Sequence, residues 1–120
     1  MIKNLLFAGI GGFIGTVLRY LPYQFIKINQ NFWITLFINI IGSFLIGLII
    51  GYGLKNQVWD AKWRSFFAVG VCGGFTTFSS FSIENVQLLQ NGKIAESIIY
   101  IGISIISGLL AAYLGLKLSL

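Results

Sequence analysis

Four long stretches that are almost free of charged residues constrain this chain more than any other feature of its sequence. A helix that crosses a bilayer needs about 20 mostly apolar residues. Stretches of that kind occupy residues 4–23, 32–54, 63–89 and 94–116. They predict an all-α membrane protein with four transmembrane helices, folded as a single transmembrane domain over residues 1–120.

The composition fits a protein surrounded by lipid. Hydrophobic residues make up 57% of the chain and charged residues 9%, against roughly 25% charged residues in a soluble domain. A soluble domain of this size buries only about two-thirds of the surface of its unfolded chain, so the remaining apolar surface would aggregate in water. We therefore expect a multi-pass protein of the inner or plasma membrane, with lipid as its surroundings.

The ionisable residues exclude several kinds of function. The net charge is +5, but the basic residues lie singly near the ends of apolar stretches, where they reach lipid headgroups, so no nucleic-acid partner is expected. The chain has no His and one cysteine, Cys72, which argues against a zinc or Cys/His catalytic site. No nucleophile, base and metal-ligand set can be assembled from these residues, so we do not expect an enzyme.

The connections between the stretches indicate the topology. They are short and polar, at residues 27–31 and 90–93, which makes neighbouring helices antiparallel, and an even number of crossings puts both termini on one side of the membrane. The basic residues on that side are Lys3, Lys55, Lys62, Arg64 and Lys117, and those on the other side are Arg19, Lys27 and Lys93. Five against three is a small bias toward a cytoplasmic N-terminus, and it leaves insertion in both orientations open.

Small residues four positions apart predict where helices pack closely. In lipid, close approach of backbones supplies the packing energy. The sets with this spacing are Gly11 with Gly15, Gly47 with Gly51, and Ser104 with Gly108 and Ala112. Four short helices cannot easily enclose a pathway of their own, so we expect some of these faces to meet a second subunit.

Polar residues inside the apolar stretches are informative, because buried polar groups are costly in hydrocarbon. Arg19 shares a face of the first stretch with Gly12 and Gly15. It is either an anchor in the headgroups or a fixed charge that attracts anions to an aqueous vestibule. Asn39 lies in the middle of the second stretch, one turn after Thr35. Its amide either hydrogen-bonds a neighbouring helix or donates to an ion in a pathway.

The third stretch contains the most informative segment, residues 72–84, with the sequence CGGFTTFSSFSIE. Paired Gly next to paired Thr forms helix poorly, so the segment predicts either a simple kink or a helix that is broken in the middle of the membrane. A break frees backbone carbonyls, which is tolerated only inside protein or along a cavity. Together with Thr hydroxyls, these carbonyls would suit a small hard cation.

Beyond the predicted break, aromatic and hydroxyl side chains occupy adjoining faces. Phe78 and Phe81 are three residues apart, and Thr77, Ser80 and Glu84 follow helical spacing next to them. Paired Phe residues are usually core packing. Ring edges carry a positive partial charge, however, and hydroxyls can donate, so together they could replace the water around a small anion.

These segments resemble the Fluc (CrcB) family of fluoride channels along essentially the whole chain. The resemblance is carried by residues 11–20 (GGFIGTVLRY), by 35–39 (TLFIN) with Gly42, and above all by 73–82 (GGFTTFSSFS) with Glu84. Ile34 departs from the family, which usually has Gly before the Thr that matches Thr35. Some family members are also pairs of different subunits with fixed, opposite orientations.

The resemblance implies a fold, a function and site residues. The fold is an antiparallel, dual-topology dimer with two fluoride pores, either a homodimer or a pair with a homologous subunit. The function is passive fluoride export, which lowers cytoplasmic fluoride and its toxicity. The pathway residues it implies are Arg19, Asn39, Phe78, Phe81 and Tyr100, to which the polar face described above adds Thr77, Ser80 and Glu84. The resemblance also implies a structural sodium ion, not transported, on backbone oxygens of Gly73 and Thr76.

Two other functions fit the composition. A small proton-coupled exporter with four helices can also insert both ways, but it needs a carboxylate inside the membrane to couple protons. Glu96 is near a helix start, so only Glu84 could serve. A purely structural subunit of a larger complex would leave Asn39 and the Gly-Gly-Phe-Thr-Thr segment unexplained.

Overall fold

The structure, a computed structural model, describes residues 1–26, 31–57 and 59–120. These residues form helices and no strands, in the order α1 (Ile2–Phe25), α2 (Phe32–Asn56), α3 (Ala61–Arg64), the π-helical η1 (Ser65–Cys72), α4 (Gly73–Phe75), α5 (Phe78–Gln90) and α6 (Ile94–Ser119). Among them, 4 helices are long and apolar enough to cross a membrane, the third running from α3 to α5. The all-helical fold and the four predicted stretches are confirmed, with ends that differ by a few residues.

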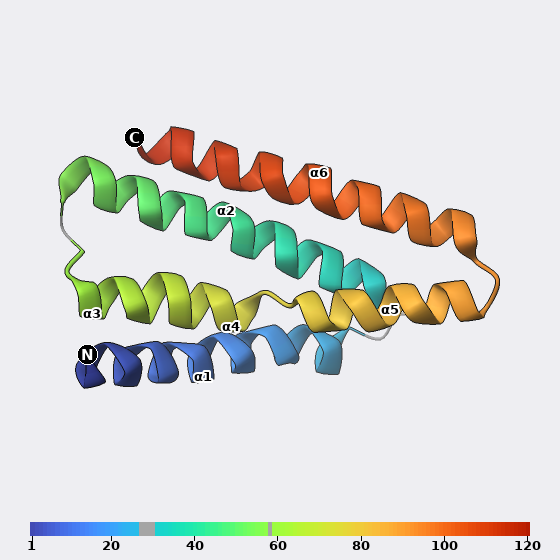
Figure 1. Cartoon of the computed structure of the whole chain (residues 1–120), viewed down its shortest axis with the longest axis horizontal. Coiled ribbons are helices and arrows are strands. Elements are labelled where there is room, and N and C mark those ends of the chain that lie inside the picture. Colours follow the sequence, from blue (N-terminus) through green and yellow to red (C-terminus); the bar gives the residue numbers. More distant parts are fainter. Residues whose placement is uncertain (27–30, 58) are drawn as a thin grey trace.

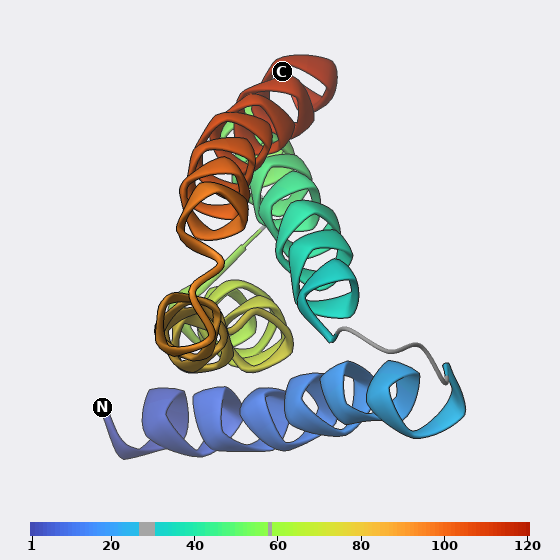
Figure 2. The same ribbon diagram turned by 90° about the vertical axis from the view of Figure 1, so that its right-hand side faces the viewer.

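The four long helices run alternately up and down the molecule, and both termini lie at the same end (Figure 1). α2 packs along α6, and α1 packs along η1 and α4. Seen from the end, α2 and α6 form one inclined pair, and α1 lies beneath the third helix (Figure 2).

The predicted connection at residues 27–31, with Lys27, falls mainly outside the described residues. The connection between α5 and α6 is short, with Gly92 at a φ of 75°, a conformation that glycine adopts without strain.

Glycines form the contact between α1 and the third helix. A Cβ added to Gly15 would collide with the carbonyl of Val71 and would lie 2.9 Å from the nitrogen of Phe75. Gly11 would meet backbone of the same helix. The predicted packing of Gly11 and Gly15 is therefore confirmed, and the two backbones touch without intervening side chains.

Glycines also join α2 to α6, although not at every predicted position. A Cβ on Gly47 would lie 2.8 Å from the nitrogen of Leu116, and one on Gly51 would lie 2.8 Å from the carbonyl oxygen of the same residue. On α6 the tight contact is at Gly115, 3.0 Å from the nitrogen of Leu48. Of the predicted set on this helix, Ala112 packs its backbone against Gly47, whereas Gly108 has room for a side chain beside the described residues of this chain. The α2–α6 crossing lies nearer the C-terminus than the Gly108 turn.

Two threonines separate α4 from α5 in the third helix. Thr76 has φ −84° and ψ 158° and Thr77 has φ −147° and ψ 118°, so both are extended between α4 and α5. The Thr77 hydroxyl caps the new helix by accepting from the backbone nitrogen of Ser80 at 3.1 Å, which is the usual way a threonine starts a helix.

Much of the outer surface is apolar. Large side chains such as Phe13, Val69, Phe78 and Leu109 are exposed. A patch of this size on a single chain marks contact with lipid or with another protein, so the described helices have the surface of a multi-pass membrane protein.

Candidate functional site

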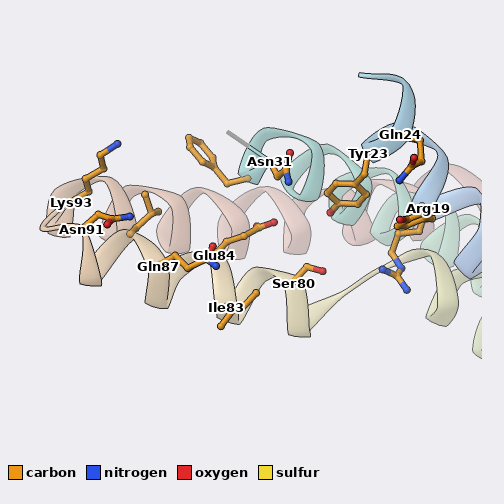
Figure 3. Close-up of a pocket in the computed structure, with 13 residues that line it drawn as sticks. Arg19, Tyr23, Gln24, Asn31, Ser80, Ile83, Glu84, Gln87, Asn91 and Lys93 are labelled. Atoms are coloured by element: carbon orange, nitrogen blue, oxygen red, sulfur yellow. The ribbon is translucent and has the colours of Figure 1, made fainter. Parts of the chain in front are cut away.

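A cavity of about 890 Å³ opens where the end of α1 and the start of α2 face α5 (Figure 3). Arg19, Tyr20, Tyr23 and Gln24 of α1 line one side. The other residues that line it are Asn31, Phe32, Ser80, Ile83, Glu84, Gln87, Leu88, Asn91 and Lys93. Amide, hydroxyl and basic side chains line this cavity beside apolar ones, and Glu84 is the one carboxylate among the described residues that line it. The cavity therefore offers hydrogen-bond donors next to apolar surface.

Glu84 is held at the inner wall of this cavity by two hydroxyl groups. The Thr35 hydroxyl donates to Oε2 and the Tyr100 hydroxyl donates to Oε1, each at 2.7 Å. Thr35 is 0% exposed and Tyr100 is 3% exposed. The hydroxyl of Tyr23 in turn hydrogen-bonds that of Thr35. Hydrogen bonds thus link side chains of α1, α2 and α6 to a single carboxylate on α5.

Tyr23 is the member of this group that sequence reasoning missed. A tyrosine near the end of an apolar stretch usually marks the membrane interface, and nothing in its spacing indicates a partner in the next helix. Tyr100 and Glu84 were each predicted as pathway residues, and the structure brings them into direct contact.

Asn39 uses its amide to bridge α2 to the extended segment. Its Nδ2 donates to the carbonyl of Thr77 at 3.1 Å, and its Oδ1 accepts from the backbone nitrogen of Thr77 at 2.8 Å. The hydrogen bond to another helix, one of the two alternatives for Asn39, is therefore present. A carboxamide has two N–H donors, so one N–H of Asn39 has no partner among the described residues and lies beside a second cavity, which Asn39 lines.

The second cavity, of about 350 Å³, lies between α2, the Thr76–Thr77 segment and α6. The residues that line it are Asn39, Gly42, Ser43, Ile46, Cys72, Gly73, Thr76, Thr77, Phe78, Phe81, Ser104, Ile105 and Gly108. The hydroxyl of Ser104 is buried there and has no hydrogen-bond partner among the described residues. Most of the residues predicted for the fluoride pathway or the sodium site border this cavity.

The two phenylalanines differ in their surroundings. Their ring centroids are 5.7 Å apart. Phe81 is half-buried and packs edge-on against Tyr100 with centroids 5.1 Å apart, whereas Phe78 is 78% exposed. Phe81 is therefore fixed by its own chain, and Phe78 points away from it.

The predicted hydroxyl ladder is not a single line. Ser80 and Glu84 both border the first cavity, but Thr77 borders the second. The reason is that Thr77 is extended and precedes α5, so helical spacing cannot be counted from it. The Thr77 hydroxyl is also engaged as the helix cap.

Arg19 reaches inward from α1. Its Nε donates to the carbonyl of Gly74 at 3.0 Å, at the end of α4, and its side chain lines the first cavity (Figure 3). A positive group at this point also offsets the partial negative charge of a helix C-terminus. Of the two alternatives for Arg19, this position favours the charge beside a vestibule.

The carbonyls of Gly73 and Thr76 have the chemistry that sodium needs. In the described part of the chain neither accepts a hydrogen bond, because the nitrogen of Thr77 bonds to Asn39 and that of Ser80 to the Thr77 hydroxyl. Neutral oxygens suit a hard cation. Two oxygens are too few to enclose such an ion on their own.

Comparison with known proteins decides the family. The profile of a family described as "CrcB-like protein, Camphor Resistance (CrcB)" matches residues 6–116. The chain belongs to the CrcB family. It is also similar over nearly its whole length to curated relatives that are named "Fluoride-specific ion channel FluC".

Three of these relatives come from different bacteria. The protein of Azobacteroides pseudotrichonymphae is 44% identical over 118 residues, which are 96% of this chain and 94% of the relative. The protein of Thermus thermophilus is 42% identical over 120 residues, which are 98% of this chain and 94% of the relative. The protein of Flavobacterium psychrophilum is 41% identical over 118 residues, which are 96% of this chain and 95% of the relative. With four helices able to span a membrane, this CrcB protein is a multi-pass membrane protein.

Proposed function

We propose that this CrcB protein is a fluoride-specific ion channel, through which fluoride leaves the cell down its electrochemical gradient. The observation that carries the proposal is its similarity, over at least 96% of its length, to proteins named as fluoride-specific channels. Passive export of this kind lowers cytoplasmic fluoride and its toxicity. The named function of these relatives is transport rather than an enzymatic reaction.

The chemistry of the two cavities supports this function. Fluoride is small and strongly hydrated, so a pore must replace its water with donors that do not hold it too tightly. The free N–H of Asn39, the Ser104 hydroxyl and the ring edges of Phe78 and Phe81 are neutral donors of that kind. Arg19 would raise the local concentration of anions at the first cavity.

The proposed channel is an antiparallel dual-topology dimer. The second cavity opens on the outer face of the chain beside Phe78, which is 78% exposed, so a second copy packed there would both close it and cover this ring. In that arrangement the Thr76–Thr77 segment is the break in the middle of the membrane. Whether the second copy is identical or a homologous subunit does not alter this reasoning.

A sodium ion at the dimer centre would fit the free carbonyls of Gly73 and Thr76. Its role in this proposal is structural: it would neutralise and join oxygens from two copies of the extended segment. Fluoride does not pass through this site.

The proton-coupled exporter is the less favoured function. Glu84, the carboxylate it would need, is already bonded by the hydroxyls of Thr35 and Tyr100. The relatives are named as channels.

Fluoride efflux from liposomes that contain only this purified chain tests the proposal. With the voltage held by a potassium ionophore, we expect fluoride to flow without a pH gradient and chloride to remain inside. Flux that requires an imposed pH gradient would support the exporter and contradict the channel.

A further inference from the structure

Tyr23 occupies a position between the first cavity and the buried group around Glu84. It lies in the last turn of α1, next to Pro22, and its side chain lines the cavity. Figure 3 shows its ring and the Glu84 side chain facing one another from opposite walls. Tyr23 is partly exposed, whereas Thr35 and Tyr100 are buried. It is therefore the outermost hydroxyl of the group.

The direction of each hydrogen bond follows from the number of protons. Thr35 has one hydroxyl proton, and it points to Oε2 of Glu84. The contact between Tyr23 and Thr35 must then use the proton of Tyr23. The chain of donors runs from Tyr23 to Thr35 to Glu84, and Tyr100 donates to the other oxygen of Glu84.

Because of this order, Tyr23 can give up its hydrogen bond at a lower cost in free energy than Thr35 or Tyr100. If its hydroxyl turns away, Thr35 loses one accepted bond but still donates to Glu84. The remaining bonds around the carboxylate are undisturbed. By contrast, turning Thr35 or Tyr100 would take away the hydroxyl that donates to one of the two Glu84 carboxylate oxygens.

We propose that Tyr23 is an ion-binding residue at the mouth of the fluoride pathway, where its phenol hydroxyl turns from Thr35 to donate to fluoride in the first cavity. This inference rests on the proposed channel function. A phenol is a neutral donor, so it replaces part of the hydration shell without holding the ion by charge. Arg19 lines the same cavity and attracts the anion to it.

The chain offers a matched pair of variants for the test. Tyr23→Phe removes only the hydroxyl. Tyr113→Phe makes the same change on α6, at a tyrosine that is 57% exposed and that lines neither the first nor the second cavity. Both are purified as full-length chains, and fluoride efflux is measured across a range of fluoride concentrations with the voltage clamped.

We expect Tyr23→Phe to lower flux roughly three- to tenfold at low fluoride, as for the loss of one donor, and to approach the parent at high fluoride. Tyr113→Phe should match the parent throughout. A Tyr23→Phe flux that equals the parent would overturn the inference. A flux that falls by the same factor at every fluoride concentration, together with a lower unfolding temperature, would also overturn it, because Tyr23 would then only hold α1 against α2. A parent that passes no fluoride would overturn both this inference and the channel.

Discussion

Asn39, Glu84 and Asn85 connect different helices through their side chains. Asn39 bonds to both the backbone nitrogen and the backbone carbonyl of Thr77, and Glu84 accepts hydrogen bonds from hydroxyls of α2 and α6. Such bonds satisfy polar groups that would find no hydrogen-bond partner in the hydrocarbon of the bilayer. They also fix where the remaining donors point, so structural and functional roles coincide in the same residues.

Replacing Asn39 by Ala should affect both stability and flux. The backbone nitrogen and carbonyl of Thr77 would lose their partners, and an unpaired buried polar group costs about 1–3 kcal/mol. The control is Asn56→Ala, since Asn56 is exposed and, among the described residues, its side chain bonds to Tyr52 on its own helix. Thermal unfolding in detergent and fluoride efflux measure the two effects. An Asn39→Ala protein as stable as Asn56→Ala would contradict the bridge.

Replacing Phe81 by Ile should sharply cut fluoride flux while the protein stays folded. Ile keeps apolar volume but removes the ring edge that could face an anion and the contact with Tyr100. Phe78→Ile should act in the same direction, and Leu110→Ile on α6 should do little because Leu110 is exposed. Efflux from liposomes at equal protein content is the measurement. If both phenylalanine variants conduct like the parent, ring edges do not select fluoride here.

The sequence alone was sufficient to single out most of these residues but not their partners. Asn39 and Glu84 stand out because polar residues in apolar stretches are conspicuous. Tyr23 does not, since its role depends on a contact with Thr35 that no spacing within one helix can reveal. Thr77 was assigned to the wrong face, because it lies before α5 and not within it.

At the scale of helices, two kinds of contact hold the chain together. Glycines bring α1 against the third helix and α2 against α6. α5 has no glycine, and it is attached to α2 and α6 through side chains: Thr35 and Tyr100 bond to Glu84, and Ser97 bonds to Asn85. Hydropathy predicted the existence and length of the helices well. It could not predict the π-helical η1 or which glycines meet backbone, because both depend on the neighbouring helix.

Gly15→Ala should destabilise the α1 contact. A methyl group there would collide with backbone atoms of Val71 and Phe75 that cannot move aside easily, and overpacking of this kind costs about 1–3 kcal/mol. Gly9→Ala is the matched control on the same helix, because a Cβ at Gly9 meets nothing within 4 Å. It should be neutral or stabilising by up to about 1 kcal/mol from helix propensity. Equal unfolding temperatures for the two variants would contradict the close contact.

Ser97→Ala should loosen α5 from α6. The Ser97 hydroxyl is 1% exposed and donates to Oδ1 of Asn85 at 2.9 Å, while Nδ2 of Asn85 donates to the carbonyl of Phe81 at 2.8 Å. Losing this donor should cost about 1–3 kcal/mol. Ser107→Ala on the same helix should cost much less, since in the described part of the chain the Ser107 hydroxyl bonds to the Ile103 carbonyl within α6. Hydrogen exchange of α5 amides would detect the loosening, and unchanged exchange relative to Ser107→Ala would exclude it.

At the scale of the whole molecule, a single chain leaves one cavity open and several polar groups without partners among the described residues. The second cavity is open beside an exposed Phe78, the Ser104 hydroxyl has no partner among the described residues, and the carbonyls of Gly73 and Thr76 accept no hydrogen bond there. All three lie around the extended segment. A second copy packed on this face would complete them together, which is why the proposed dimer and the proposed sodium site depend on each other.

Sodium should therefore stabilise the dimer without driving transport. A ligand that binds only the assembled form stabilises it by about 1.4 kcal/mol for each tenfold rise in concentration above the dissociation constant. We expect replacement of sodium by N-methylglucamine to favour dissociation in detergent and to lower fluoride flux, whereas a sodium gradient across the liposome at saturating concentrations should not change the direction of flux. Thr76→Ser keeps the carbonyl and should retain the sodium response. If neither dimer stability nor flux depends on sodium, the protein has no structural sodium site. If the direction of fluoride flux reverses with the sodium gradient, sodium is a transported ion.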